Sequence, residues 1–394
     1  MFTPRHSHIF NLYMQLSDRS ITMKNVEKIT FNNRTSREFS KTVKERVDQY
    51  FEKNDLSKHA NVQMVVKTVV MLVVYLGSYA LIISGQFSLG TMWFLTFLMG
   101  VGTAGIGFSI SHDALHGAYS SNKHLNNALG YTFNLLGANG YIWKITHNII
   151  HHTYTNIHGH DEDLEIAGFI RLSPHSEHKM IHRVQHILAF FTYSLAMVTW
   201  VFIKDYKNFL KTNIGPYDSK NHPLHEWVIL FVTKGIYYAY ILVFPMLLLD
   251  ISWVHLIIGF LTLHFTAGVI IGMVFQLAHV VEGTDHPLPD EDNMIDEHWM
   301  IHEMITTNNF ARDNKALCWF VGGLNFQIEH HLFPRVCSIH YPAISPIVKK
   351  TAEEFNIPYN HHETFFKAIA SHYRTLKKHG NPDFSYSEAS NAGG

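Results

Sequence analysis

The sequence predicts an all-α integral membrane protein, in which four transmembrane helices form two hairpins and a cytoplasmic helical cap holds a histidine-rich metal site. The first indication is four apolar segments, each close to the about 20 residues that a helix needs to cross the hydrocarbon core. The second is composition, because only 16% of the 394 residues are charged, whereas soluble domains average about 25%. The third is histidine, whose 30 copies nearly equal the 31 lysines and arginines together.

The two ends of the chain are predicted to be polar and to carry one helix each. Residues 1–63 are interpreted as a cytoplasmic N-terminal segment with an amphipathic helix ahead of the membrane. Its apolar residues recur every four positions, which is helical spacing; they are Phe39, Val43, Val47 and Phe51. Residues 360–394 are expected to form a C-terminal helix and a polar tail.

The membrane domain is predicted to cover residues 64–359. Its four spans come in two pairs, at about 64–83, 89–110, 227–249 and 253–277. The links within the pairs, 84–88 and 250–252, contain neither Lys nor Arg. Nearly all basic residues lie in the N-terminal segment, in the region 111–226 and in the C-terminal region after 278, so the positive-inside rule places these regions in the cytoplasm.

Some residues in or near the spans are expected to have structural roles only. The apolar stretch 186–203 is not counted as a span, because a crossing there would put the third histidine cluster on the side opposite to the other two. It is expected to lie in the interface or to pack in the cytoplasmic part. Lys67 and Lys234 have long stems that can reach the membrane surface. His264, inside the fourth span, is expected to be hydrogen-bonded within the bundle.

Three histidine clusters flank the spans and supply seven candidate metal ligands: His112, His116, His147, His151, His152, His330 and His331. Residues four apart on a helix lie on one face, with Cβ atoms about 5–6 Å apart, so the first cluster can converge on one ion, as can His147 and His151. His152 points about 100° away from His151, which suits a second, neighbouring metal. The third cluster repeats this pair, with Gln327 one turn earlier. Because seven ligands exceed the needs of one ion, two metals are predicted.

His279, at the cytoplasmic end of the fourth span, is the candidate eighth ligand. It lies at the level where His112 leaves the second span, and ionisable groups next to a membrane are functional candidates. The alternative is a histidine that caps the helix C-terminus, where the helix dipole favours its cation. His158 and His160, which precede Asp161, are candidates for orienting the true ligands. Other histidines with similar spacing are expected not to bind metal: His175, His178, His182, His298 and His302.

Composition excludes some classes of protein but does not identify the metal. A formal net charge of -1 offers no basic stripe for nucleic acid. Cys318 and Cys337 are the only cysteines, so neither a disulfide framework nor a thiolate metal site is available. Soluble di-iron bundles use Glu-x-x-His pairs, and none of the clusters has that form. Imidazole ligands suit zinc, copper, nickel and iron alike.

The set H-x3-H, H-x3-HH and Q-x2-HH, with membrane spans between its second and third members, resembles that of the integral-membrane fatty acid desaturases. The resemblance covers about residues 64–359 and extends to the residues around the clusters: Trp143-Lys-Ile-Thr-His147, Thr153-Tyr-Thr-Asn156, Asp161-Glu-Asp-Leu164 and Gly323-Leu-Asn-Phe-Gln327-Ile-Glu-His-His-Leu-Phe-Pro334. It implies two iron ions (Fe2+/Fe3+) held by the histidines, and O2 as the co-substrate that removes two hydrogens from an acyl chain. No catalytic residue separate from the metal ligands is expected.

Gln327, at the start of the third cluster, is similar to the glutamine of the front-end desaturases. Those enzymes place a double bond between an existing one and the carboxyl end, as linoleoyl-CoA Δ6 desaturases do. The resemblance therefore implies a polyunsaturated acyl substrate such as linoleoyl, on an acyl-lipid or acyl-thioester carrier. It makes Gln327 a candidate for a weak iron ligand or for a hydrogen-bond donor to bound oxygen.

The resemblance also has consequences for partners and location. Eukaryotic front-end desaturases usually carry a fused cytochrome b5 domain with a His-Pro-Gly-Gly motif, whereas His222-Pro and His286-Pro here lack the glycines. A separate electron donor, a ferredoxin or a cytochrome b5-type protein, is therefore expected. The compact form is similar to bacterial members, which implies the inner membrane with the metal site facing the cytoplasm.

Three alternatives keep the histidines but change the function. Di-iron acyl hydroxylases and alkane monooxygenases have similar clusters and yield an alcohol in place of an alkene. A histidine-rich metal transporter would need ligands near the bilayer midplane, where only His264 is predicted. A structural zinc site closes with four ligands, fewer than the seven or eight histidines available here.

Overall fold

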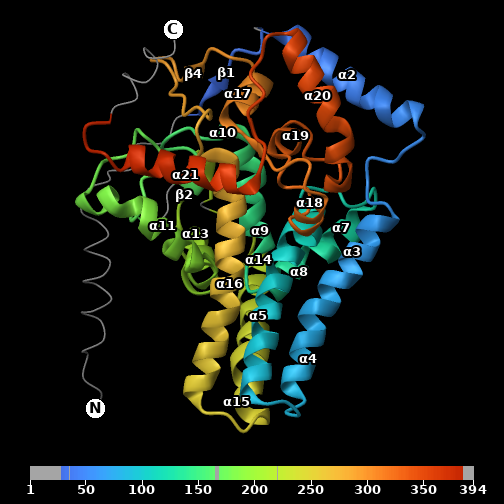
Figure 1. The fold of residues 1–394 in the computed structure, drawn as a ribbon, viewed down its shortest axis with the longest axis vertical. Coiled ribbons are helices and arrows are strands. Elements are labelled where there is room, and N and C mark those ends of the chain that lie inside the picture. The colour runs from blue at the N-terminus through green and yellow to red at the C-terminus, as the bar shows by residue number, and fades with distance from the viewer. Residues whose placement is uncertain (1–27, 35, 165–167, 220, 385–394) are drawn as a thin grey trace.

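The computed structural model describes residues 28–34, 36–164, 168–219 and 221–384, and these residues are mostly helical. Four helices that are long and apolar enough to cross a membrane lie along one bundle (Figure 1): Val62–Ile83, Leu89–Leu115, Leu224–Leu248 and Trp253–His279. The prediction of a mostly helical chain with four such helices is confirmed. The second helix runs five residues further than expected, so that His112 lies in its last turn.

Three of the four spans are built from consecutive helical elements in which a short π-helical segment joins two α-helices. The first contains α3 (Val62–Leu72), η1 (Val73–Gly77) and α4 (Ser78–Ile83); the second α5 (Leu89–Ile106), η2 (Gly107–Ser111) and α6 (His112–Leu115); the third α14 (Leu224–Tyr238), η7 (Ala239–Val243) and α15 (Phe244–Leu248). The fourth is one continuous helix, α16 (Trp253–His279). A Cβ atom on Gly100 would lie 2.7 Å from the carbonyl oxygen of Leu263, so glycine there lets α5 and α16 approach closely.

The remaining elements gather toward the end of the bundle where α16 finishes (Figure 1). Those between the second and third spans are α7 (Lys123–Gly130), α8 (Thr132–Leu135), α9 (Gly140–Trp143), η3 (Lys144–His151), α10 (His152–Tyr154), η4 (Glu162–Leu164), η5 (Met180–Val184), α11 (Gln185–Ser194), α12 (Ala196–Thr199), η6 (Trp200–Lys204) and α13 (Asp205–Leu210). Those outside this region are α2 (Arg37–Lys53), α17 (Trp299–Thr306), α18 (Lys315–Phe320), α19 (Gln327–Leu332), η8 (Ser338–His340), α20 (Tyr341–Glu354) and α21 (Phe365–His379).

Among the described residues, two of the three pairs of two-residue strands connect distant parts of this region. β1 (Thr30–Phe31) runs parallel to β4 (Met294–Ile295), and β5 (Asn309–Phe310) runs parallel to β6 (His361–His362). β2 (Asn213–Ile214) and β3 (Tyr217–Asp218) form a local antiparallel pair. The first two pairs connect the chain ends to the segment that follows α16.

The predicted N-terminal amphipathic helix is confirmed as α2. The four apolar residues expected on its inner face are all buried, and they pack into one cluster with residues of α20. Arg46 of α2 also forms an ion pair with Glu354 of α20, with an Nη2–Oε2 distance of 2.7 Å. Helix α2 therefore covers α20, and the apolar face of α2 is buried against protein.

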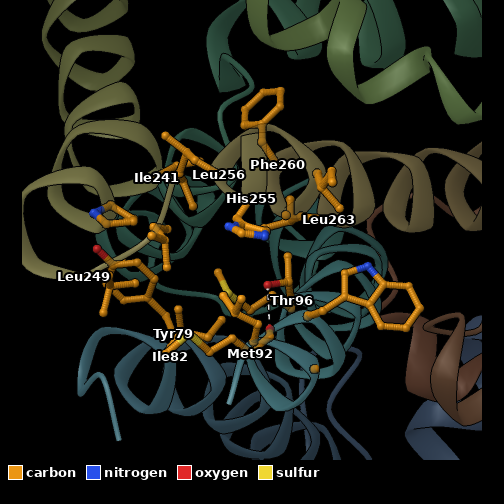
Figure 2. Close-up of a pocket in the computed structure, with 18 residues that line it drawn as sticks. Tyr79, Ile82, Met92, Thr96, Ile241, Leu249, His255, Leu256, Phe260 and Leu263 are labelled. Atoms are coloured by element: carbon orange, nitrogen blue, oxygen red, sulfur yellow. Dashed lines mark hydrogen bonds between the residues drawn. The ribbon is translucent and has the colours of Figure 1, made fainter. Parts of the chain in front are cut away.

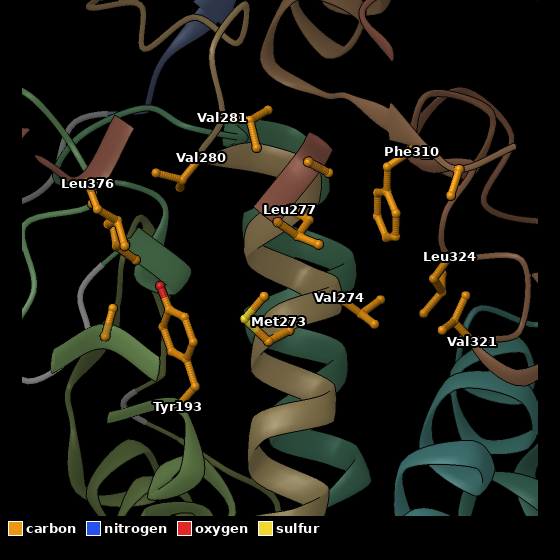
Figure 3. Packing of buried hydrophobic residues seen from close by; sticks show 14 of the residues in the cluster. Tyr193, Met273, Val274, Leu277, Val280, Val281, Phe310, Val321, Leu324 and Leu376 are labelled. Carbon is orange, nitrogen blue, oxygen red and sulfur yellow. The ribbon is translucent and has the colours of Figure 1, made fainter. Parts of the chain in front are cut away.

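The apolar stretch around residues 186–203 forms two helices bent by 55°, Met180–Ser194 and Ala196–Leu210. The first of them packs against the inner half of α16, because a Cβ on Gly268 would lie 2.6 Å from the carbonyl oxygen of Ser194. Figure 3 shows Tyr193 facing Met273 across this contact. The segment thus packs against the C-terminal half of α16.

Both lysines that were expected to reach the membrane surface are buried, so that prediction was wrong. The Lys234 ammonium lies 2.8 Å from the Asp205 carboxylate and donates a 2.7 Å hydrogen bond to the carbonyl of Gly137. The Lys67 ammonium lies 5.9 Å from the centre of the Trp319 ring. In both cases the side chain turns inward to a partner that is far away in the sequence. The limits of the spans alone do not predict such a partner.

The interior of the bundle contains one predicted polar contact and one apolar cavity. His264 is fully buried and bonds to the hydroxyl of Tyr237 at 2.6 Å, as expected for a polar residue turned into the bundle. A cavity of about 390 Å³ lies among α4, α5, η7, α15 and α16, between residues such as Met92, Leu249 and Leu256 (Figure 2). It lies near the start of α16, about 36 Å from the end of that helix at a rise of about 1.5 Å per residue.

Candidate metal centre

The structure brings all eight candidate histidines together at the end of the bundle where α16 finishes. They fall into overlapping sets whose potential ligand atoms lie within 4.8 Å of one another: His112, His116, His147 and His330; His151, His279 and His331; and His152, His330 and His331. The first set and the second share no residue, and His152 lies between them. Seven of the eight side chains are buried, His116 being the one of intermediate exposure.

Local backbone conformation decides how the second cluster converges. His147 and His151 lie in η3, which is π-helical, and not in the α-helix that the spacing predicted. A π-helix places residues five apart on one face, so His152 lies over His147, with their Nε2 atoms 3.2 Å apart. In the potential ligand sets His152 groups with His330 and His331 and not with His151. Such π-helical segments are frequent at functional sites.

In several of these histidines Nδ1 contacts a protein group, while Nε2 points into the space that the rings enclose. On one side, Nδ1 atoms face fixed partners: His151 faces Asp161 at 3.0 Å, His331 faces Glu303 at 2.6 Å and His330 faces the Tyr341 hydroxyl at 3.2 Å. On the other side, several Nε2 atoms are buried and have no hydrogen-bond partner among the described residues: those of His112, His116, His151, His279, His330 and His331. Unsatisfied buried polar groups are costly, and metal coordination would satisfy them.

Buried carboxylates contact the Nδ1 atoms of three candidate ligands: Asp113 lies 3.5 Å from His112, Asp161 contacts His151, and Glu303, which sequence reasoning missed, contacts His331. Glu303, on α17, is fully buried and also accepts a 2.9 Å hydrogen bond from Thr155. It has no metal-ligand spacing to any cluster, so nothing in the sequence marked it. Asp161 was noted as the neighbour of His158 and His160 and as part of the resemblance, without a role of its own, yet it is the carboxylate that contacts His151. Neither His158 nor His160 appears among the convergent groups of the described chain.

The electrostatics of the site favour neutral imidazoles. Burial, followed by repulsion from neighbouring rings, holds the pKa well below its usual value in five residues: His116, His147, His152, His330 and His331. His151 differs, because attraction to Asp161 overcomes the effect of burial and raises the pKa of His151 to about 9. Neutral histidine is the form that binds metal, so binding at His151 would displace a proton.

The remaining predictions about single residues fall outside the converging set or stay predictions. The Gln327 side chain is buried and donates a 2.8 Å hydrogen bond to the carbonyl of Leu324. Its expected role as an iron ligand or as a hydrogen-bond donor to oxygen stays a prediction. His298 caps α17 and bonds to Ser40. None of the five histidines expected not to bind metal belongs to a convergent group in the described chain.

A narrow apolar cavity adjoins the histidines. It is lined by His112 and Trp143 together with side chains from α5, η2, α8, η6 and α16, including Phe108, Trp200 and Phe275. The ring of Phe275 also lies 5.8 Å from that of His147. The cavity has a free volume of about 30 Å³. The arrangement therefore places a hydrophobic compartment against a cluster of nitrogen ligands.

Four apolar helices that end in a buried histidine cluster beside an apolar compartment define a class of membrane-bound oxidoreductase. The family model described as fatty acid desaturase matches residues 88–363, and the chain belongs to this family. It is an enzyme that desaturates fatty acids.

Similar proteins agree with this assignment. The chain is 36% identical over 362 residues to the sn-1 linoleoyl-lipid 6-desaturase of Synechocystis sp., covering 91% of this chain and 99% of that protein. It is 37% identical to the protein of the same name from Arthrospira platensis, covering 89% and 94%. It is 34% identical to the acyl-lipid (8-3)-desaturase of Physcomitrium patens, covering 88% and 72%.

Proposed function

We propose that this protein carries out O2-dependent, front-end desaturation of a polyunsaturated acyl chain, such as linoleoyl, esterified to a membrane lipid. The observation that carries the proposal is the set of buried, unpartnered Nε2 atoms beside an apolar cavity. The names of the cyanobacterial relatives, which act on linoleoyl-lipids, support the substrate class. Gln327 at the head of the third cluster supports the front-end type.

The eight histidines fit two iron ions. The first would be held by His112, His116, His147 and His330, and the second by His151, His279 and His331, with His152 between them. Two bound irons would supply O2 activation and removal of one hydrogen from each of two adjacent carbons. In the overall reaction, two electrons from a donor and two from the acyl chain, with two protons, reduce O2 to two waters.

The protein's own contribution is to position the groups and to exclude water. Asp161 and Glu303 hold the Nδ1 sides of His151 and His331, which fixes their rings with Nε2 toward the enclosed space. Trp143 and Phe275 form an apolar wall beside the histidines, where one carbon–carbon bond of the acyl chain can be held. An acyl chain is far larger than the cavity, so its entry requires these side chains to move apart. Position matters, because about 1 Å of misplacement can cost about 10²-fold in rate.

The proposal includes the organisation and orientation of the chain. The membrane domain covers residues 64–359 with the spans in two hairpins, and the basic regions around the histidines face the cytoplasm. The cyanobacterial relatives support a bacterial inner membrane. A separate ferredoxin or cytochrome b5-type protein would deliver the electrons to this face.

The test is expression in a bacterial host supplied with linoleate and with α-linolenate, followed by gas chromatography and mass spectrometry of the lipids. We expect a new double bond between the existing ones and the carboxyl end, retained on the lipid fraction. His147→Ala and His331→Ala should abolish the product, whereas His124→Ala, at an exposed histidine, should not. An alcohol product, or unimpaired product from either cluster variant, would refute the proposal.

A further inference from the structure

A second polar site lies away from the histidine cluster, in a pocket between η5, α11 and α21. Its lining is rich in basic side chains: Arg183, His186, Arg374, Lys377 and Lys378, with Asp383 as the one carboxylate. Arg374 is neutralised by Glu282, with an Nη2–Oε2 distance of 2.5 Å. Within the part of the chain that the structure describes, Arg183, Lys377 and Lys378 form no ion pair. The pocket therefore carries excess positive charge.

An exposed apolar stripe runs from the rim of this pocket along η5 and α11. Met180 is 80% exposed, Ile187 63% and Phe191 62%, and Val184 lies between them. Ile187 and Phe191, four residues apart, share one face of α11, and Met180 and Val184 extend the exposed apolar surface in the preceding η5 turn. Such a continuous exposed apolar surface marks a protein or membrane contact.

The position of α11 indicates that this stripe faces lipid. Its C-terminal end touches α16 at Gly268 and Gly272, where Cβ atoms would lie 2.6 Å from Ser194 and 2.8 Å from Tyr193. Gly268 is 11 residues before the end of α16 at His279, or about 16 Å along a helix. Helix α11 therefore descends beside a membrane span, and Arg183, near the opposite end of the same helical segment, lies near the membrane surface.

We propose that this pocket binds the phosphate of an anionic phospholipid in the leaflet on the histidine side. Arg183 and Lys377 supply charge-assisted hydrogen bonds to the phosphate, and Lys378 adds a third cation. The Nδ1 atom of His186 is buried without a partner among the described residues, and it is a further group for the headgroup. The apolar stripe along α11 then accommodates the acyl chains. This site requires no metal and is separate from the catalytic one.

Neither helix capping nor protein docking accounts for the whole arrangement. Lys377 and Lys378 lie in the last turn of α21, where cations complement the helix dipole, but this does not explain Arg183, which approaches from η5. An acidic electron-transfer protein would fit the positive charge, but it would leave the adjacent lipid-facing stripe without a role. Basic clusters directly beside a membrane-embedded helix are typical of sites for anionic lipids.

The test uses the full-length, iron-loaded protein in detergent with equal amounts of phosphatidylglycerol and phosphatidylcholine that have the same acyl chains. Native mass spectrometry measures the lipids retained. The test variant is R183Q/K377Q/K378Q, and the control K41Q/K44Q/K53Q removes the same charge from exposed positions on α2. We expect the native protein and the control to retain phosphatidylglycerol preferentially. The test variant should bind it roughly 100-fold more weakly, at about a factor of five for each cation removed, with an unchanged melting temperature.

Three outcomes would overturn the proposal. One is equal retention of phosphatidylglycerol by the test and control variants. Another is displacement of the lipid by millimolar inorganic phosphate, which would identify a site for soluble anions. The third is normal lipid retention by the test variant together with slower reduction by an acidic ferredoxin, which would identify a surface for docking of the electron donor.

Discussion

At the scale of single residues, the metal centre depends on side chains that orient the ligands without being ligands. Glu303 is the clearest case, because its carboxylate is fully buried against Nδ1 of His331. Burial raises the pKa of Glu303 well above its usual range, and the hydrogen bond from Thr155 and attraction to His151 oppose this shift. A change at this position acts on the metal through His331.

We expect Glu303→Gln to keep the shape of the site but to weaken metal binding. The amide cannot accept the Nδ1 proton with the strength of a carboxylate, and loss of such a partner typically costs 10–100-fold in metal affinity. Iron content after competition with a chelator measures this effect. The matched control is Glu297→Gln, at an exposed position just before α17. Equal iron retention by the two variants would contradict the role assigned to Glu303.

The residue scale also shows where sequence reasoning succeeds. The spacing of His112 and His116, and the adjacency of His330 and His331, are local properties of a helix, so their convergence could be predicted. Glu303 and Asp161 reach the ligands through tertiary packing, with no periodic relation to them. The burial of Lys67 and Lys234 was missed for the same reason, since each has its partner in another element.

At the scale of elements, close helix contacts hold the bent segment against α16. We expect Gly268→Ala to lower stability by about 1–3 kcal/mol, because its Cβ would overlap the backbone oxygen of Ser194, which cannot move freely. Gly235→Ala on α14 is the control: a Cβ there meets nothing within 4 Å, and alanine should stabilise the helix by up to about 1 kcal/mol. Thermal unfolding in detergent measures both. A Gly268 variant as stable as the native protein would show that α11 does not pack as described.

A buried ion pair connects α13 to α14. Removing one partner leaves a buried charge, so Asp205→Ala should cost about 3–5 kcal/mol, with Lys234 left unpaired. The double variant Asp205→Leu/Lys234→Met should be more stable than Asp205→Ala alone, because it removes both charges. Thermal unfolding of Asp205→Leu, of Lys234→Met and of the double variant provides the comparison. Additive losses would mean that the two side chains do not interact.

Element boundaries were predictable and helix types were not. The four spans lie within a few residues of the predicted limits at most ends, because hydrocarbon thickness fixes their length. The π-helical register of η3 has no hydropathy signature, yet it decides that His152 lies over His147. The sequence thus located the ligands but not the backbone geometry that directs them.

At the scale of the whole molecule, buried histidines outside the metal centre make folding sensitive to acid. Burial lowers the pKa of His372 to about 4 and that of His379 to about 3, whereas an unfolded histidine titrates near about 6.5. Between these values the unfolded chain binds more protons than the folded one. The stability contributed by the neutral rings is therefore complete above about pH 6.5 and is lost as the pH falls toward 4.

We expect the free energy of unfolding to fall between pH 6.5 and 4, by up to about 1.4 kcal/mol per pH unit for each such residue. His372 bonds to Tyr193 and to the carbonyl of Val280, which holds α21 against the segment after α16. His372→Gln should flatten this pH dependence, whatever its effect at neutral pH. Melting temperatures across this range test the expectation, and an unchanged slope would exclude His372 as a contributor.

The metal centre is assembled from segments at the second span, η3, the end of α16 and α19. A translating ribosome therefore releases the first imidazoles long before their partners in α19 exist. In the proposed centre neither set of ligands can close until then, so iron would be loaded only after nearly complete synthesis. A nonsense codon between the end of α16 and His330 would yield a fragment that keeps the four apolar helices but lacks His330 and His331, one from each proposed set of ligands.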